Sequence, residues 1–124
     1  MEASLTLNIA KYGSMSVFCS INYSNKEWNS AAVQNIENSM RPKWDQLAIF
    51  EDLDLQKSLV VRVFHKTLLF ISQEIGSCEL KLEDIFNGHQ NEWWILTSKR
   101  GILAGNILLI FDCFEKSWNE VEFV

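Results

Sequence analysis

Apolar and polar residues alternate along most of this chain with a period of two. The pattern is clearest over residues 57–65, where Leu59, Val61 and Val63 occupy every second position. Side chains of a strand point alternately to opposite faces, so this pattern predicts half-buried β-strands. Similar runs at other places bring the number of expected short strands to about eight. They lie at residues 5–9, 17–21, 27–34, 46–50, 75–82, 93–96 and 106–111.

The connections between these runs are short and rich in turn-forming residues. Residues 51–54 form an acidic connection that we expect to be a solvated loop, and residues 84–90 form a connection that includes one helical turn. No amphipathic helix of about ten or more residues separates two strands, which excludes a βαβ arrangement. The pattern therefore predicts an all-β fold, an eight-stranded antiparallel β-sandwich.

The last residues of the chain follow a different period. Phe114, Trp118 and Val121 are spaced by four and then three residues, which places them on one face of a helix. We expect a short C-terminal tail, helical or extended, that docks on something, because so short a helix is marginal alone. Two alternatives stay open: the tail packs on its own sandwich, or it enters a partner protein.

Length and composition limit the architecture. The chain has 124 residues, of which 48% are hydrophobic, one is proline and five are glycine. This composition excludes disorder and a long flexible linker, and the length favours one domain. We expect a domain over residues 1–113 and a C-terminal extension over residues 114–124.

Charge and targeting signals limit the function further. The formal net charge is −5 and the sequence pI is about 5.0, whereas nucleic-acid-binding domains usually carry a basic surface. The N-terminus lacks the features of a signal peptide, and no apolar run approaches the length of a membrane span. Three cysteines without metal-ligand spacing, Cys19, Cys78 and Cys113, are expected to be ordinary thiols of a cytosolic protein.

A specific motif lies in the segment 40–50, which reads Met-Arg-Pro-Lys-Trp-Asp-Gln-Leu-Ala-Ile-Phe. It resembles the Asn-Pro-x-Trp-Asn-Glu-x-Phe-x-Phe segment that precedes the fourth strand of C2 domains. Pro42 and Trp44 match that motif, and Asp45 and Gln46 are close substitutes. The resemblance implies that both matching residues are structural, since proline fixes the entry into the strand and the tryptophan covers the end of the sandwich.

Other segments are similar to C2 strands in the order that the family has them. The resemblance extends over about residues 4–113, nearly the whole chain, and implies a C2-like sandwich. The matching segments are 5–11, 57–65, 75–80, 93–96 and 105–110.

The resemblance does not extend to the calcium site of the family. Calcium needs six to eight oxygen ligands, which C2 domains supply from loop aspartates. In this chain the first loop, 11–15, has no carboxylate, and His65 and Thr67 stand where the second loop has aspartates. Only Glu74 remains nearby, so we expect no calcium binding and no other cofactor.

The basic cluster of lipid-binding C2 domains is reduced to Lys26 and Lys43. One feature that suits a lipid surface remains, the apolar loop Leu68-Leu69-Phe70-Ile71 between two predicted strands. Four consecutive apolar residues on a loop indicate an interaction unless the adjoining strands extend and bury them. Core, protein contact and membrane contact all stay open for this loop.

No catalytic constellation is present in the sequence. Nucleophile elbows, metal-protease motifs and phosphate-binding glycine loops are missing, and His65 and His89 lie far apart in the chain. We therefore expect a non-catalytic, calcium-independent module that binds a protein, as an adaptor or structural subunit of a cytoplasmic, cytoskeletal or membrane-bound assembly. Phe70 and Trp118 are the expected anchors. The alternative is a peripheral membrane module that inserts the loop 68–71.

Overall fold

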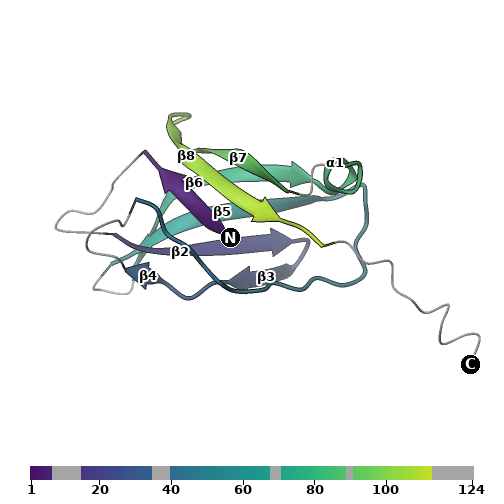
Figure 1. The fold of residues 1–124 in the computed structure, drawn as a ribbon, viewed down its shortest axis with the longest axis horizontal. Helices are drawn as coiled ribbons and strands as arrows, with labels where there is room; N and C mark the ends of the chain where they lie inside the picture. Colours follow the sequence, from purple (N-terminus) through teal and green to yellow (C-terminus); the bar gives the residue numbers. More distant parts are fainter. Residues whose placement is uncertain (7–14, 35–39, 68–70, 89–90, 113–124) are drawn as a thin grey trace, which may run out of the picture.

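The computed structural model describes residues 1–6, 15–34, 40–67, 71–88 and 91–112. These residues form eight strands and one short helix, α1 (Leu82–Phe86), between the sixth and seventh strands (Figure 1). The strands are β1 (Glu2–Leu5), β2 (Ser16–Tyr23), β3 (Lys26–Asn29), β4 (Val33–Gln34), β5 (Ser58–Lys66), β6 (Ser72–Lys81), β7 (Asn91–Thr97) and β8 (Leu103–Ile110).

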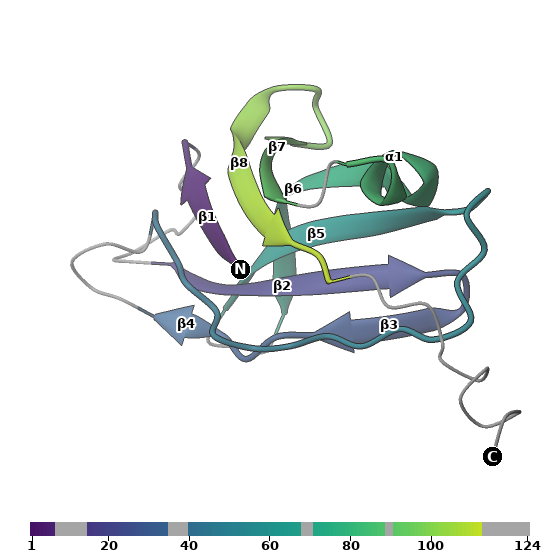
Figure 2. The same cartoon turned by 45° about the vertical axis from the view of Figure 1, so that its right-hand side comes forward.

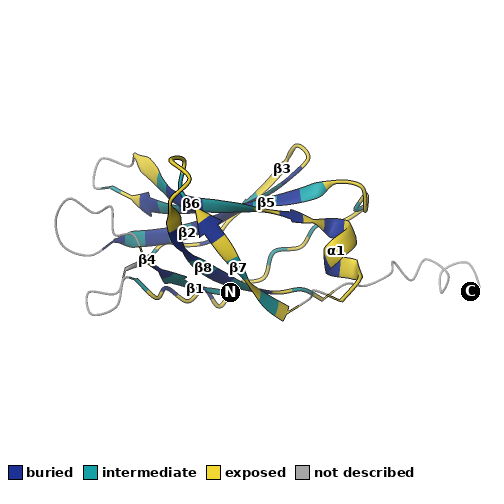
Figure 3. Cartoon of the chain, turned by 90° about the horizontal axis from the view of Figure 1, so that it is seen from above, coloured by how far each residue is buried: buried dark blue, intermediate teal, exposed yellow. Residues whose placement is uncertain are grey.

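All strand pairs are antiparallel, and the strands follow the order β1-β8-β7-β6-β5-β2-β3, with β4 also paired to β2. Strands β6 and β7 share only the pair Ser77↔Thr97, whereas the other long neighbours pair over many residues. The sheet curls at this weak junction into two layers, β3-β2-β5-β6 and β7-β8-β1 (Figures 2 and 3). The predicted all-β antiparallel sandwich is therefore confirmed.

The inner faces of the two layers form one core. Alternate residues of β2 and β5, including Val17, Cys19 and Val63, have no exposed surface, and Ile107 of β8 meets them from the other layer. Each buried aliphatic side chain contributes about 1.5–3 kcal/mol of hydrophobic stabilisation. The alternation along the sequence thus correctly predicts which residues of these strands face the core.

The segment 40–44 lies along the edge of β1 that β8 leaves free. Ala3 N–H donates to the Pro42 carbonyl at 3.0 Å, and Trp44 N–H donates to the Met1 carbonyl at 2.8 Å. The Trp44 side chain is 1% exposed, and its Nε1 donates to the Val17 carbonyl at 3.1 Å. Pro42 is also fully buried. This segment therefore connects the β1 edge to β2 of the other layer.

The strand expected at residues 46–50 does not form, and that prediction is wrong. The segment 40–44 pairs with β1, whereas the backbone of residues 46–50 pairs with no strand of the described residues. The weak strand expected at residues 27–34 is present as two strands, β3 and β4. Ser30 separates them, because its Oγ accepts the Cys19 N–H at 2.8 Å.

Other expectations are met in part. Strand β1 shares only Leu5 with the expected 5–9 strand, Thr6 is not in a strand, and residues 7–14 lie outside the described chain. The helical turn expected within residues 84–90 corresponds to α1. The tail residues Phe114, Trp118 and Val121 lie outside the described residues, so the domain boundary at 113 stays a prediction. No helix in the described ranges has the length and apolar character needed to cross a membrane.

Candidate functional site

The apolar loop expected at residues 68–71 is described only at its last residue. Ile71 is 58% exposed, immediately before β6, which argues against a core position for this side chain. Thr67 and Ile71 close the loop, since the Thr67 N–H donates to the Ile71 carbonyl at 3.0 Å. The other residues, Leu68, Leu69 and Phe70, lie outside the described chain.

The positions that replace calcium ligands have structural partners here. His65 is only 8% exposed, and its Nδ1 accepts the Ser16 N–H at 3.0 Å, so it fastens β5 to the start of β2. The Glu74 carboxylate forms an ion pair with Arg62 at 3.2 Å. Within the described ranges no three His, Cys, Asp or Glu side chains group in a way that could hold a metal ion.

The described thiols are poor nucleophiles. Burial raises the pKa of Cys19 to about 12, with a smaller contribution from Cys78, and burial alone raises the pKa of Cys78 to about 12. Both side chains therefore stay protonated near neutral pH, whereas thiol chemistry requires the thiolate. Cys113 lies outside the described residues.

The outer surface of β2, β5 and β6 is occupied by its own side chains, and we call it the closed face. Phe18 and Phe64 stack with ring centroids 5.1 Å apart. Beside this stack, Arg62 pairs with Glu74 and also donates to Asn22 Oδ1 at 3.2 Å. A shallow cavity of about 310 Å³ lies at its border, next to Phe18.

The outer surface of β7, β8 and β1 has a different composition. The strand register aligns one row across it, because Trp93 pairs with Leu108, Leu108 with Glu2, and Glu2 with Lys43. All four residues point away from the core, since the residues beside Lys43 and Leu108 are buried, Ala3 beside Glu2 is buried, and Trp94 beside Trp93 packs on the core. This row joins an indole and a leucine to two charged groups.

A second row runs parallel to the first. Ile95 pairs with Asn106, and Asn106 pairs with Ser4. Arg41 is the next residue in this row, two positions before Lys43 on an extended segment. Together with Ile110, which pairs with Asn91 of β7, these rows make an amphipathic surface that we call the open face. The open face consists of Trp93, Ile95, Leu108, Ile110, Glu2, Ser4, Arg41 and Lys43.

The apolar part of the open face is accessible to solvent. Trp93 is 49% exposed, Ile95 is 64% exposed and Ile110 is 62% exposed. Figure 3 shows exposed positions along β7. Exposed apolar side chains that adjoin one another indicate an interaction site, whereas isolated ones are ordinary.

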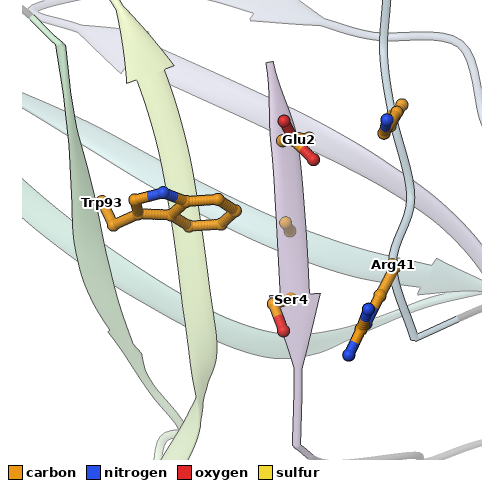
Figure 4. A pocket seen from close by; sticks show the side chains of 6 residues that line it. Glu2, Ser4, Arg41 and Trp93 are labelled. Carbon is orange, nitrogen blue, oxygen red and sulfur yellow. The ribbon is translucent and has the colours of Figure 1, made fainter.

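A shallow cavity of about 440 Å³ lies between the apolar and basic parts of the open face. In Figure 4 the indole of Trp93 extends from β7 across β8 toward β1, Glu2 and Ser4 lie in the middle, and Arg41 lies on the far side. Arg41 and Lys43 have no ion pair with any described residue. The cavity therefore offers an aromatic wall, two available cations and one carboxylate.

This arrangement suits the recognition of a binding partner. An indole and a guanidinium provide contact area and directed hydrogen bonds, and both are enriched among the residues that dominate protein interfaces. Among the residues that line the cavity, none is a thiol or an imidazole. The site can bind an extended apolar surface that carries an acidic group at one side.

The open face is not identified by the sequence alone. Local pattern assigns Arg41 and Lys43 to a strand entry and groups Lys43 with Lys26, whose Nζ instead reaches the Glu51 carbonyl at 3.4 Å. The available signal is the pair Trp93-Trp94 within one strand, because one of two adjacent strand residues must face outward. Only the register across β8 and β1 brings Trp93 into one row with Lys43.

The model of the C2 domain family matches residues 2–97. This chain belongs to the C2 domain family. The likeness seen in the Pro42 and Trp44 motif is thereby confirmed, and C2 domains are modules that bind membranes or proteins. No curated protein matches the chain.

Solved C2 structures are similar to this chain in fold. A single C2 domain of plant Extended Synaptotagmin 1 gives a TM-score of 0.66 at 15% sequence identity, with 90% of each chain covered. A structure of two tandem C2 domains of Extended-Synaptotagmin 2, calcium bound, gives a TM-score of 0.66 at 18% identity, with 87% of this chain and 40% of that chain covered. At these identities the likeness concerns the fold alone.

Proposed function

We propose that this C2 domain is a non-catalytic, calcium-independent module that binds a protein partner through the open face, as an adaptor or structural subunit of a larger assembly. The observation that carries this proposal is the row Trp93–Leu108–Glu2–Lys43, with Ile95 and Ile110 exposed beside it. Protein interfaces combine an apolar centre with a polar rim, and tryptophan and arginine dominate their energetics.

Charge favours a protein over an anionic membrane at this face. The open face has two available cations, with Glu2 between them and the indole, and the whole chain has a net charge of −5. Attraction to an anionic bilayer grows by about 1 kcal/mol for each basic residue near the surface, so clusters of four or more are usual. Two cations and a carboxylate suit a single acidic side chain of a partner better.

A second candidate function is peripheral membrane binding through the loop 68–71. The exposure of Ile71, next to Lys66 at the end of β5, supports it. The similar solved structures are of extended synaptotagmins, one of them with calcium bound. The tail residues Phe114, Trp118 and Val121 remain candidate partner contacts.

The proposal is tested by affinity capture from the native cell with matched variants. Trp93→Ser removes the centre of the open face, and Leu55→Ser, at a residue 46% exposed outside that face, is the control. Proteins captured by the wild type and by Leu55→Ser but not by Trp93→Ser are the expected result. Equal capture by both variants would contradict the proposal.

Three further measurements test the membrane function, calcium independence and the role of the tail. Co-sedimentation with anionic vesicles in EDTA, lost in Leu69→Asp and retained in Trp93→Ser, would favour the membrane function. Calorimetric titration with Ca²⁺ tests calcium independence, and saturable heat at micromolar Ca²⁺ would contradict it. Trp118→Ala tests the tail: capture should fall while the melting temperature stays unchanged.

A further inference from the structure

Residues 45–51 are extended but unpaired, and we call them the 45–51 stretch. Leu47 is 76% exposed and Ile49 is 72% exposed, whereas Ala48 and Phe50 are half-buried and pack on the core. This alternation is that of a strand. Figures 1 and 2 show the stretch as a long trace that runs past β3 before the chain turns to β5.

The backbone of the 45–51 stretch forms no β-ladder hydrogen bonds with the described residues. None of its N–H groups donates to a backbone carbonyl or a side chain of the described residues, and at its end the Glu51 carbonyl accepts a hydrogen bond from Lys26 Nζ at 3.4 Å. A row of unpaired backbone groups beside exposed apolar side chains is a template for another strand.

The hydrogen-bonding side of this edge follows from the segment before it. The Met40 and Pro42 carbonyls and the Trp44 N–H face β1. Because the backbone groups of successive residues alternate in direction, those of Gln46, Ala48 and Phe50 lie on the same side as the 40–44 groups. These are the backbone groups that a strand added to the stretch would use.

The charges of the stretch indicate what kind of strand would pair with it. Residues 44–56 include four acidic residues, among them Asp45 and Glu51 at the ends of the stretch, and no lysine or arginine. Both end residues are exposed. In the register that pairs the whole stretch with a second copy of itself, Asp45 lies opposite Glu51, and like charges placed opposite each other destabilise a strand pair.

We propose that the 45–51 stretch is a β-augmentation site, which takes up an extended peptide segment with alternating apolar side chains and basic residues at its ends. Backbone hydrogen bonds from Gln46, Ala48 and Phe50 would hold the peptide. Leu47 and Ile49 would contact its apolar side chains on the outer surface. This site is separate from the open face and does not depend on the function proposed for it.

The test uses a synthetic peptide of about nine residues, the length of an ordinary strand, that alternates valine and threonine and carries lysine at both ends. Control peptides replace the lysines by glutamates or two central residues by prolines. Fluorescence anisotropy should show binding of the basic peptide at least about tenfold tighter than binding of either control. Equal affinity for all three would overturn the proposal.

Two variants locate the binding. Ala48→Pro removes one N–H from the pairing side without removing any intramolecular hydrogen bond and should reduce affinity about tenfold or more. The double variant Asp45→Lys with Glu51→Lys should reverse the preference toward the glutamate peptide, whereas Glu79→Lys, at an exposed position of β6, should not. Near-ultraviolet circular dichroism verifies that each variant is folded.

The remaining outcomes also decide the matter. Unchanged affinity in folded Ala48→Pro would overturn the proposal, because main-chain pairing at this edge could not then hold the peptide. A dimer that forms with rising concentration and is abolished by Ala48→Pro would assign the edge to a second copy and overturn the assignment to a basic peptide. Retention of peptide binding in Trp93→Ser would confirm that the site is separate from the open face.

Discussion

The two outer faces of this sandwich differ in whether their aromatic and charged side chains have partners within the domain. On the closed face Phe18 stacks with Phe64, and Arg62 pairs with Glu74. On the open face the indole of Trp93 has no stacking partner among the described aromatic rings, and Arg41 has no ion pair there. Groups that satisfy one another stabilise the domain, whereas groups left unsatisfied on a well-ordered sheet are available to a partner.

The largest expected effect tests whether the two faces share one core. Trp44→Ala removes a fully buried indole and leaves the Val17 carbonyl without its donor. A buried tryptophan replaced by alanine costs about 3–5 kcal/mol, and the loss should disturb both layers because Trp44 joins them. Urea unfolding followed by circular dichroism measures this. A loss below about 1 kcal/mol would show that the layers are independent.

A somewhat smaller loss of stability is expected from a change at Gly105, where β8 pairs with β1 under the open face. Gly105 has φ of +144°, and a Cβ at this position would collide with the Ser4 carbonyl oxygen and lie 2.8 Å from the Leu5 Cα. Gly105→Ala should therefore separate β1 from β8 and cost about 3 kcal/mol or more.

Hydrogen exchange is the sharper measurement for this variant. Amides of β1 should lose protection in Gly105→Ala, while amides of β2 and β5 keep most of theirs. Equal loss of protection in all strands would contradict the division of the sheet at the β6–β7 junction.

A matched pair of aromatic substitutions compares the two faces directly. Phe64→Ala should cost about 1–2 kcal/mol, because it removes a stacked pair and its packing. Trp93→Ser should change the free energy of unfolding by no more than about 0.5 kcal/mol, because half of that side chain is already exposed. Thermal unfolding of both variants measures the contrast, and a larger loss for Trp93→Ser would reverse the account.

The smallest expected effect on stability at neutral pH comes from the thiols of Cys19 and Cys78, which lie in the layer under the closed face. The folded-state pKa of Cys19 and of Cys78 is raised to about 12 from an ordinary value of 9.0. The folded protein thus keeps protons that the unfolded chain releases, so stability is fully present below about pH 9 and falls as the pH rises toward 12. Slow labelling of both residues at about pH 8, measured by mass spectrometry, is expected.

Much of the fold could be predicted from local pattern. The alternation of Leu59, Val61 and Val63 correctly identified the inward face of β5, because burial on one side enforces a period of two. The motif around Pro42 and Trp44 indicated the C2 family, which the family model confirms. These features depend on nearby residues, so the sequence displays them.

The failures involve partners that lie far apart in the chain. Leu47 and Ile49 alternate as strand residues do, yet no strand of the described chain pairs with them. The alternation reveals an extended chain but not whether a neighbour exists. The open face was missed for the same reason, because Trp93 and Lys43 become neighbours only through the registers of β8 and β1.

The central claim is that the open face, rather than the closed face, contacts the partner. Hydroxyl-radical footprinting of the domain, alone and in its native assembly, tests this claim most directly. The account predicts that oxidation of Trp93, Ile95 and Ile110 falls in the assembly, while oxidation of Phe18 and Phe64 does not change. Protection of Phe18 and Phe64 with Trp93 still fully reactive would contradict it.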